Sequence, residues 1–231
     1  MKVLAVICAR GGSKGLPRKN VLDLNGMPVI AWSVEAAHQA RLVKRTVLST
    51  DDAEIIAAAK AADCDVPFVR PPELATDTAS IYDALFHALD QLGGNFDHVV
   101  LLQATSPLRT GSDIDACIEL CAATKAPAVV SVTKAAKPPH WMYTVTTDGT
   151  LAPAMPKAEE IDRRQEAPDF VVPNGAVYVA DIAWLRARRN FISPETRAYL
   201  MPPERSIDID AYLDLVTARA VQAEMQKGGF S

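Results

Sequence analysis

The chain has 231 residues, of which 49% are hydrophobic and 23% are charged, a composition typical of a globular protein with a sizeable core. Its net charge of −4 excludes a general nucleic-acid-binding protein, and no apolar run is long enough to span a membrane. The four cysteines follow no disulfide or zinc-site spacing, and the first residues do not match a signal peptide. We therefore expect a cytoplasmic protein with reduced cysteines and with neither nucleic-acid nor membrane partners.

Apolar runs alternate with helical patterns, and this alternation predicts parallel βαβ units with right-handed crossovers. Strands are expected at Val3–Cys8, Arg45–Ser49, Val66–Val69, His98–Gln103, Ala128–Val132 and Gly175–Val179. Helices are expected at Val29–Ala40, from an Asp51-Asp52 cap to about Ala62, and at Ser80–Leu92, Ile114–Ala123 and Ala211–Met225. The predicted fold class is α/β with a mostly parallel sheet, in a single domain over residues 1–231. Ligands of such sheets bind beyond the carboxyl ends of the strands.

The regular alternation stops near Lys134, and residues 134–172 contain many prolines and few long apolar runs. Tyr143 and Val145 are expected on one strand of a hairpin, with Leu151 on the other. Such an inserted excursion either covers a site as a flap or reaches another subunit as an arm. The sequence pattern leaves both possibilities open.

Residues 9–20, which follow the first predicted strand, combine three glycines with four cations. Glycine lets the backbone approach phosphate oxygens closely, and Lys and Arg offset phosphate charge. The glycine spacing matches neither a P-loop nor the dinucleotide fingerprint. We therefore predict a phosphate-binding loop of another kind.

Within this loop, Arg10 and Lys14 are expected to face phosphate oxygens, and Ser13 offers a hydroxyl donor. Asn20 is expected to hydrogen-bond a ribose or substrate hydroxyl. Arg18 and Lys19 are equally compatible with ligand contact and with solvated surface positions.

A second polar segment, residues 102–110, also ends an apolar strand. Gln103 is expected to face the substrate, because polar side chains at the carboxyl end of a buried strand line the sites of α/β folds. The structural alternative is that this segment only turns the chain and that Thr110 or Ser112 caps the next helix. The two interpretations are compatible.

The segment 206–210 alternates two isoleucines with two aspartates, which puts Asp208 and Asp210 on one side of an extended chain. Two carboxylates this close are costly without a cation. One or two carboxylates, together with phosphates and waters, are the usual ligands of Mg²⁺. We predict a magnesium site here, with capping of the last helix by either aspartate as the alternative.

The excursion also carries Arg163-Arg164-Gln165. Adjacent arginines on a loop are commonly solvated, and these gain a role only with an acidic substrate, because a guanidinium matches a carboxylate.

Five motifs resemble, in the same order, those of the acylneuraminate cytidylyltransferases, or CMP-sialic acid synthetases. They are residues 9–20, 70–80, 102–109, 174–178 and 206–210, and the resemblance extends from residue 1 to about 226. It implies a Rossmann-like nucleotidyltransferase fold, dependence on Mg²⁺, and a homodimer that exchanges the excursion between subunits. It also implies that CTP and a nine-carbon sugar acid react to give a CMP-sugar and pyrophosphate.

The resemblance assigns roles to the matching positions. The nucleotide-binding set is Arg10, Gly11, Ser13, Lys14, Asn20, Arg70, Ala79 and Ser80, of which the last three recognise cytosine. The sugar-acid set is Gln103, Arg164, Gln165 and Tyr178. The catalytic set is Arg10, Lys14, Asp208 and Asp210, with the two aspartates as metal ligands.

Two positions depart from the family pattern. Ala104 stands where the family usually has proline, and this change removes no reactive group. Trp141 aligns with a position at which some sialic acid enzymes carry lysine, and this favours a variant acid such as legionaminate or pseudaminate. The alternatives are an enzyme for another keto-deoxy acid, such as 3-deoxy-manno-octulosonate, and a catalytically silent nucleotide-binding homologue.

Overall fold

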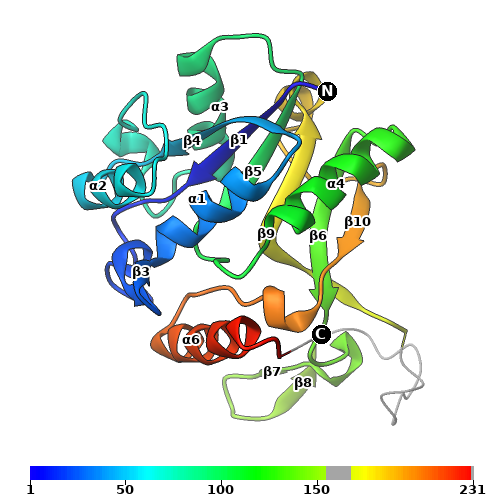
Figure 1. Ribbon diagram of the computed structural model, residues 1–231. Helices are drawn as coiled ribbons and strands as arrows, with labels where there is room; N and C mark the ends of the chain where they lie inside the picture. The colour runs from blue at the N-terminus through cyan, green and yellow to red at the C-terminus, as the bar shows by residue number, and fades with distance from the viewer. Residues whose placement is uncertain (155–167, 230–231) are drawn as a thin grey trace.

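The computed structural model describes residues 1–154 and 168–229 (Figure 1). A six-stranded sheet with the order β10-β6-β9-β5-β1-β4 forms its centre. The strands are β1 (Val3–Cys8), β4 (Val43–Ser49), β5 (His98–Gln103), β6 (Ala128–Lys134), β9 (Val171–Asp181) and β10 (Arg197–Leu200). β9 runs antiparallel to both of its neighbours, and all other pairs are parallel. The prediction of a mostly parallel α/β sheet is therefore confirmed.

Helices cover both faces of this sheet. They are α1 (Val29–Gln39), α2 (Ala53–Ala61), α3 (Ile81–Leu92), α4 (Gly111–Thr124) and α5 (Ile182–Arg188), whereas α6 (Tyr212–Gln226) packs in a separate hydrophobic cluster. Figure 1 shows α1 and α4 in front of the sheet. Among the helices described, none combines the length and the apolar character that crossing a bilayer requires.

Strand β1, which lies between β5 and β4, explains why both faces are covered. All of its residues are buried, and alternate side chains of a strand point to opposite faces. Val3, Ala5 and Ile7 pack in one core with residues of α1, α2 and α4. The residues between them pack in a second core with α3 and α5. The continuous apolar run of β1 is thus the sequence signature of a strand buried on both sides.

The predicted strand at Val66–Val69 is wrong. The sheet ladder reaches only Asp65, which forms an isolated parallel bridge with Val47 at the edge of the sheet. Pro67 has no N–H with which to continue the ladder, and Val69 is exposed.

The excursion contains the expected hairpin. β7 (Tyr143–Val145) pairs with β8 (Leu151–Pro153), with Val145 opposite Leu151, and the hairpin stands away from the main sheet (Figure 1). The sequence patterns did not predict α5, β10 or the short hairpin of β2 (Asp23–Leu24) and β3 (Met27–Pro28).

A third hydrophobic cluster, here called the loop cluster, lies beneath the loops at the carboxyl ends of β1 and β5. Its buried members are Leu16, Leu24, Val29, Leu108, Ile209, Leu215 and Ala218. Leu16 belongs to the loop after β1, Leu108 to the turn after β5, and Ile209 to the 206–210 segment. The loop cluster therefore joins the three polar segments that the sequence marked as functional.

We expect Ile209→Ala to lower the free energy of unfolding by about 2–4 kcal/mol, because it removes a fully buried side chain and leaves a cavity in the loop cluster. Urea denaturation measures the change. Ile207→Ala is the matched control, since Ile207 is only partly buried against the same cluster and should cost less. Equal losses for the two variants would contradict the deeper burial of Ile209 in the loop cluster.

Candidate active site

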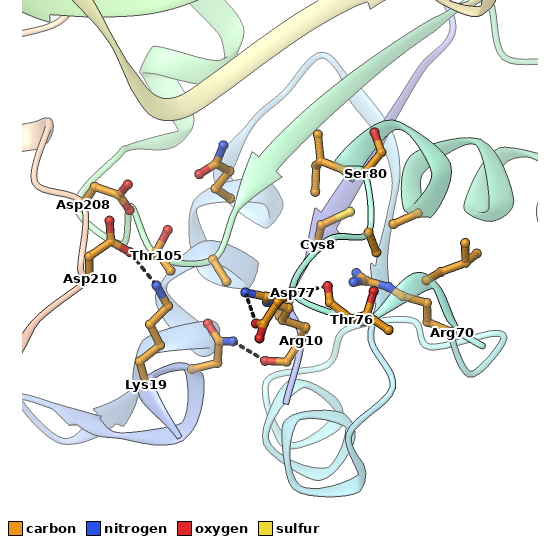
Figure 2. Close-up of a pocket in the computed structure, with 18 residues that line it drawn as sticks. Cys8, Arg10, Lys19, Arg70, Thr76, Asp77, Ser80, Thr105, Asp208 and Asp210 are labelled. Atoms are coloured by element: carbon orange, nitrogen blue, oxygen red, sulfur yellow. Dashed lines mark hydrogen bonds and ion pairs between the residues drawn. The ribbon is translucent and has the colours of Figure 1, made fainter. Parts of the chain in front are cut away.

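A cavity of about 390 Å³ opens beyond the carboxyl ends of β1 and β5 (Figure 2). Its walls come from the loop after β1, the segment that leads into α3, the end of β5, and the 206–210 segment. This is the position at which α/β sheets bind ligands. The sequence-predicted residues that line it are Arg10, Asn20, Arg70, Ala79, Ser80, Gln103, Asp208 and Asp210.

The other predicted residues are not among those described as lining the cavity. Arg164 and Gln165 fall outside the described residues. Tyr178 packs on Phe191, with ring centroids 5.3 Å apart, and its pKa is raised first by burial and then by the charge of Asp208. Among the residues described as lining the cavity, Gly11, Ser13 and Lys14 are not found. Their roles stay predictions.

The glycines of the loop allow close approach to acidic parts of the same chain. The Gly11 N–H donates to Asp51 Oδ1 at 3.1 Å, and a Cβ on Gly11 would lie 2.5 Å from Asp52 Oδ2. A Cβ on Gly15 would lie 2.5 Å from the carbonyl oxygen of Asp210. Gly15 thus brings the cationic loop against the aspartate segment.

Arg10 and Lys14, the two predicted phosphate ligands, share a carboxylate. Arg10 Nη2 lies 3.1 Å from Asp77 Oδ1, and Lys14 Nζ lies 2.8 Å from Asp77 Oδ2. Arg10 Nη1 also donates to the carbonyl of Thr76 at 2.7 Å. The hydrogen bond from Lys14 and the charges of both cations hold the pKa of Asp77 below its usual range.

Lys19 and Arg18 have different roles in the structure, although the sequence analysis gave both the same two possibilities. Lys19 Nζ donates to the carbonyl of Ile209 at 2.9 Å and to Asp210 Oδ1 at 2.7 Å, and it lines the cavity. Arg18 instead pairs with Asp52, at 2.6 Å, and with Glu54. Lys19 is a site residue, while Arg18 ties the loop to the start of α2.

Asn20 holds the loop from within. This buried side chain donates from Nδ2 to the carbonyl of Arg10 at 3.1 Å. Its Oδ1 atom is buried without a hydrogen-bond partner in the described part of the chain. That oxygen is the atom available to a ligand hydroxyl.

The acidic pair has the properties of a cation site. Burial is the main cause that raises the pKa of Asp208; the charge of Asp210 adds to it, and a hydrogen bond with Thr105 opposes it. Asp208 Oδ1 is buried and has no hydrogen-bond partner among the described residues. An unpartnered carboxylate oxygen beside a second carboxylate fits the oxygen ligands that Mg²⁺ prefers.

The alternative role of this pair, as a helix cap, is performed by another residue. Asp214 Oδ2 accepts from the N–H groups of Asp210, at 3.0 Å, and Ala211, at 2.7 Å, at the start of α6. Asp208 and Asp210 therefore direct their carboxylates to the cavity (Figure 2).

The opposite end of the cavity holds Arg70 and Ser80 (Figure 2). Arg70 is buried, and its Nε donates to Ser49 Oγ at 3.0 Å, while another guanidinium nitrogen donates to the Ser49 carbonyl. Ser80 caps α3 by accepting from the Tyr82 N–H at 3.2 Å. Cys8, which the sequence did not single out, lines the wall between strand and helix, and burial raises the pKa of its thiol.

Residues 102–110 both line the cavity and begin a helix, and contact of Gln103 with a substrate stays a prediction. Gln103 lines the cavity, and Thr110 caps α4 in a reciprocal arrangement with Asp113. Behind them lies Arg109, a buried cation that sequence patterns missed. It donates to Ser33 Oγ at 2.8 Å and to the Gln103 carbonyl, and burial lowers its pKa to about 9.

Comparisons with known proteins identify the family of this chain. Residues 4–166 match the family model described as Cytidylyltransferase. The N-acylneuraminate cytidylyltransferase of Escherichia coli is 33% identical over 98% of this chain and 53% of its own length, so the chain spans about half of that relative. The CMP-N,N'-diacetyllegionaminic acid synthase of Legionella pneumophila is 36% identical over 93% of this chain and 93% of its own length.

A solved structure has the same fold. The CMP:2-keto-3-deoxy-manno-octonic acid synthetase complexed with CTP matches with a TM-score of 0.72 at 20% identity, covering 97% of this chain and 100% of that one.

We expect Asp208→Asn to raise the free energy of unfolding at pH 7 in metal-free buffer. The raised pKa means that folding disfavours the ionised carboxyl. The resulting decrease in the free energy of unfolding is present above the folded-state pKa of Asp208 and is lost as the pH falls through that pKa. The gain from the substitution should therefore shrink on acidification. Urea denaturation across a pH series measures it, with the exposed Asp210→Asn as control. A loss of stability in Asp208→Asn at pH 7 would refute this view of the site.

Proposed function

Because the chain belongs to the cytidylyltransferase family, we propose that it transfers CMP from CTP to the anomeric hydroxyl of a nonulosonic acid and releases pyrophosphate. The observation that carries this proposal is the convergence of a cationic loop and a carboxylate pair on one cavity. The activities named for the E. coli and L. pneumophila relatives support the acceptor class. The CTP in the octonic acid synthetase structure supports the nucleotide.

The nucleotide is proposed to lie along the cavity with its triphosphate at the cationic loop. Arg10, Lys14 and Ser13 would bind the phosphates, and Asn20 would accept from a nucleotide hydroxyl. Cytosine would then face Arg70, Ala79 and Ser80. The apolar surface of Ala79, Ala84 and Cys8 at that end of the cavity suits a flat base.

The sugar acid is proposed to enter beside Gln103, between the end of β5 and the aspartate segment. Tyr178, Arg164 and Gln165 complete the proposed acceptor set, in which the guanidinium would pair with the carboxylate of the acid. Trp141 favours an acid of the legionaminate or pseudaminate type. Aromatic character continues in this part of the excursion, where the rings of His140 and Phe170 lie 5.4 Å apart.

The proposed chemistry is an in-line displacement without a covalent enzyme intermediate. The anomeric hydroxyl loses its proton to water, and its oxygen bonds to the α-phosphorus as the bond from that phosphorus to the pyrophosphate oxygen breaks. Asp208 and Asp210 would hold a magnesium ion, which would supply charge neutralisation at the phosphates. Lys19 fixes the Asp210 carboxylate, and Arg10 and Lys14 would bind the leaving pyrophosphate.

The purified protein is expected to release pyrophosphate from CTP only when Mg²⁺ and a nonulosonic acid are both present. A panel of N-acetylneuraminate, legionaminate, pseudaminate and 3-deoxy-manno-octulosonate tests the acceptor, and UTP and ATP test the base. We expect CTP with legionaminate or pseudaminate to give the highest kcat/KM.

Asp210→Asn should lower kcat by about 100-fold or more, since charge neutralisation at the phosphates is the main catalytic contribution proposed. Circular dichroism establishes that the variant is folded. Release from CTP without any acid, or full activity in Asp210→Asn, is incompatible with the proposed reaction. A clear preference for N-acetylneuraminate would reject the variant acid while leaving the reaction class intact.

The proposal includes a homodimer built through the excursion. Its hairpin exposes apolar side chains, with Tyr143 48%, Val145 72% and Leu151 67% exposed. Val171 and Val172, where the chain returns to the sheet, are exposed as well. Large apolar side chains exposed together on a hairpin are typical of a protein–protein interface.

We expect the protein to sediment as a dimer, and we expect Val145→Asp combined with Leu151→Asp to weaken the dimer at least about tenfold. Sedimentation equilibrium measures the dissociation constant. Ile192→Asp is the control, because Ile192 is an exposed apolar residue of the loop after α5. A monomeric wild type, or an unchanged dimer in the double variant, would argue against an interface at the hairpin.

A cytoplasmic location completes the proposal. The four cysteines are free and buried, as expected of a protein kept under reducing conditions. Cell fractionation tests this, and recovery of the protein outside the cytoplasm would oppose it.

A further inference from the structure

Asp77 forms ion pairs with Arg10 and Lys14, the two cations that are proposed to bind phosphate. One oxygen of its carboxylate lies 3.1 Å from Arg10 Nη2, and the other lies 2.8 Å from Lys14 Nζ. A carboxylate bridging two cations offers them the same charge-assisted contacts as two phosphate oxygens. Figure 2 shows Asp77 beside Arg10 in the middle of the cavity, between the aspartate pair and Arg70.

Another anion can replace Asp77 in these ion pairs. The side chains of Arg10, Lys14 and Asp77 are 37%, 82% and 42% exposed, and exposed pairs are weak and are screened by salt. The pair of Arg205 with Asp113 is different, because it is doubly hydrogen-bonded at 3.0 Å and the Asp113 side chain is 1% exposed. That pair is a fixed part of the fold, while the Asp77 pairs lie open to a competing anion.

The segment that carries Asp77 also forms part of the proposed base site. Residues 76–80 lead into α3, and Ala79 and Ser80 line the cavity. The Arg10 hydrogen bond to the Thr76 carbonyl ties the same segment to the cationic loop. A polyphosphate that takes Arg10 and Lys14 must displace the Asp77 carboxylate, and its own negative charge repels that carboxylate.

We propose that Asp77 is an internal counter-ion that competes with polyphosphate for Arg10 and Lys14, weakens the binding of pyrophosphate and thereby promotes its release after transfer. The inference rests on the proposed function in one respect, namely that the cationic loop binds the phosphates of CTP. It adds a residue that sets how tightly the leaving group is held. When pyrophosphate leaves, the Asp77 pairs with Arg10 and Lys14 form again and offset one of the two positive charges.

The test is calorimetric titration of the full chain with inorganic pyrophosphate in metal-free buffer, without CTP or sugar acid. Asp77→Asn should bind pyrophosphate about three- to tenfold more tightly than the wild type, because a competing carboxylate has been removed. The excess should decrease at high salt, where the competing pairs are already screened. Asp77→Glu, which keeps the charge, should bind like the wild type.

Asp90→Asn is the matched control. It removes the same charge from an exposed ion pair, with Arg186, that lies outside the residues lining the cavity. Its pyrophosphate affinity should equal that of the wild type. An equal gain in Asp90→Asn would show an effect of net charge alone and would overturn the proposal.

Equal or weaker binding by Asp77→Asn would also overturn it, since Asp77 would then be neutral toward the site or support it. That result leaves the proposed transfer reaction untouched, because pyrophosphate binding itself would have been observed. If no variant binds pyrophosphate, the loop is not a phosphate site, and both this inference and the proposed function fail.

Discussion

The site depends on the loop cluster, where Leu16, Leu108 and Ile209 pack together beneath the cavity. The loop after β1, the turn after β5 and the 206–210 segment are far apart in sequence and carry polar or charged groups. Each contributes one buried apolar side chain to the same cluster, and burial of apolar surface is the force that brings them together. The positions of the cations and carboxylates above the cluster follow from that packing. A site built on a packed base is preorganised before any ligand binds.

Above the loop cluster, most charged side chains at the cavity form ion pairs with one another before a ligand binds. Lys19 is paired with Asp210, and Arg10 and Lys14 are paired with Asp77. Asp208 differs, because its Oδ1 atom is buried and unpartnered among the residues described, and burial raises its pKa. The ionised carboxylate of Asp208, one of the two proposed metal ligands, therefore lowers the free energy of unfolding. Such a cost at a functional position, with satisfied charges around it, is typical of a site held ready for a ligand.

Sequence patterns predicted the elements that are governed by local rules. The apolar runs of β1 and β5 gave the correct bounds of both strands, because a strand buried on two faces has few polar residues to confuse the pattern. The segment at 66–69 has the same apolar character but passes the sheet edge, where Pro67 ends the pairing. The different roles of Arg18 and Lys19 could not be read from the sequence. Lys19 pairs with Asp210 and Arg18 pairs with Asp52, and tertiary packing determines these partners.

The same packing explains a buried cation that no motif indicated. Burial lowers the pKa of Arg109, and the charges of Asp208 and Asp113 partly oppose this effect. Asp113 in turn pairs with Arg205. Opposite charges therefore alternate from the cavity into the protein, and each reduces the cost of burying its neighbour. Arg109 also donates to the Gln103 carbonyl, which ties this series of charges to the end of β5. The charge that Asp208 offers to a cation is thus coupled to the position of the proposed acceptor residue Gln103.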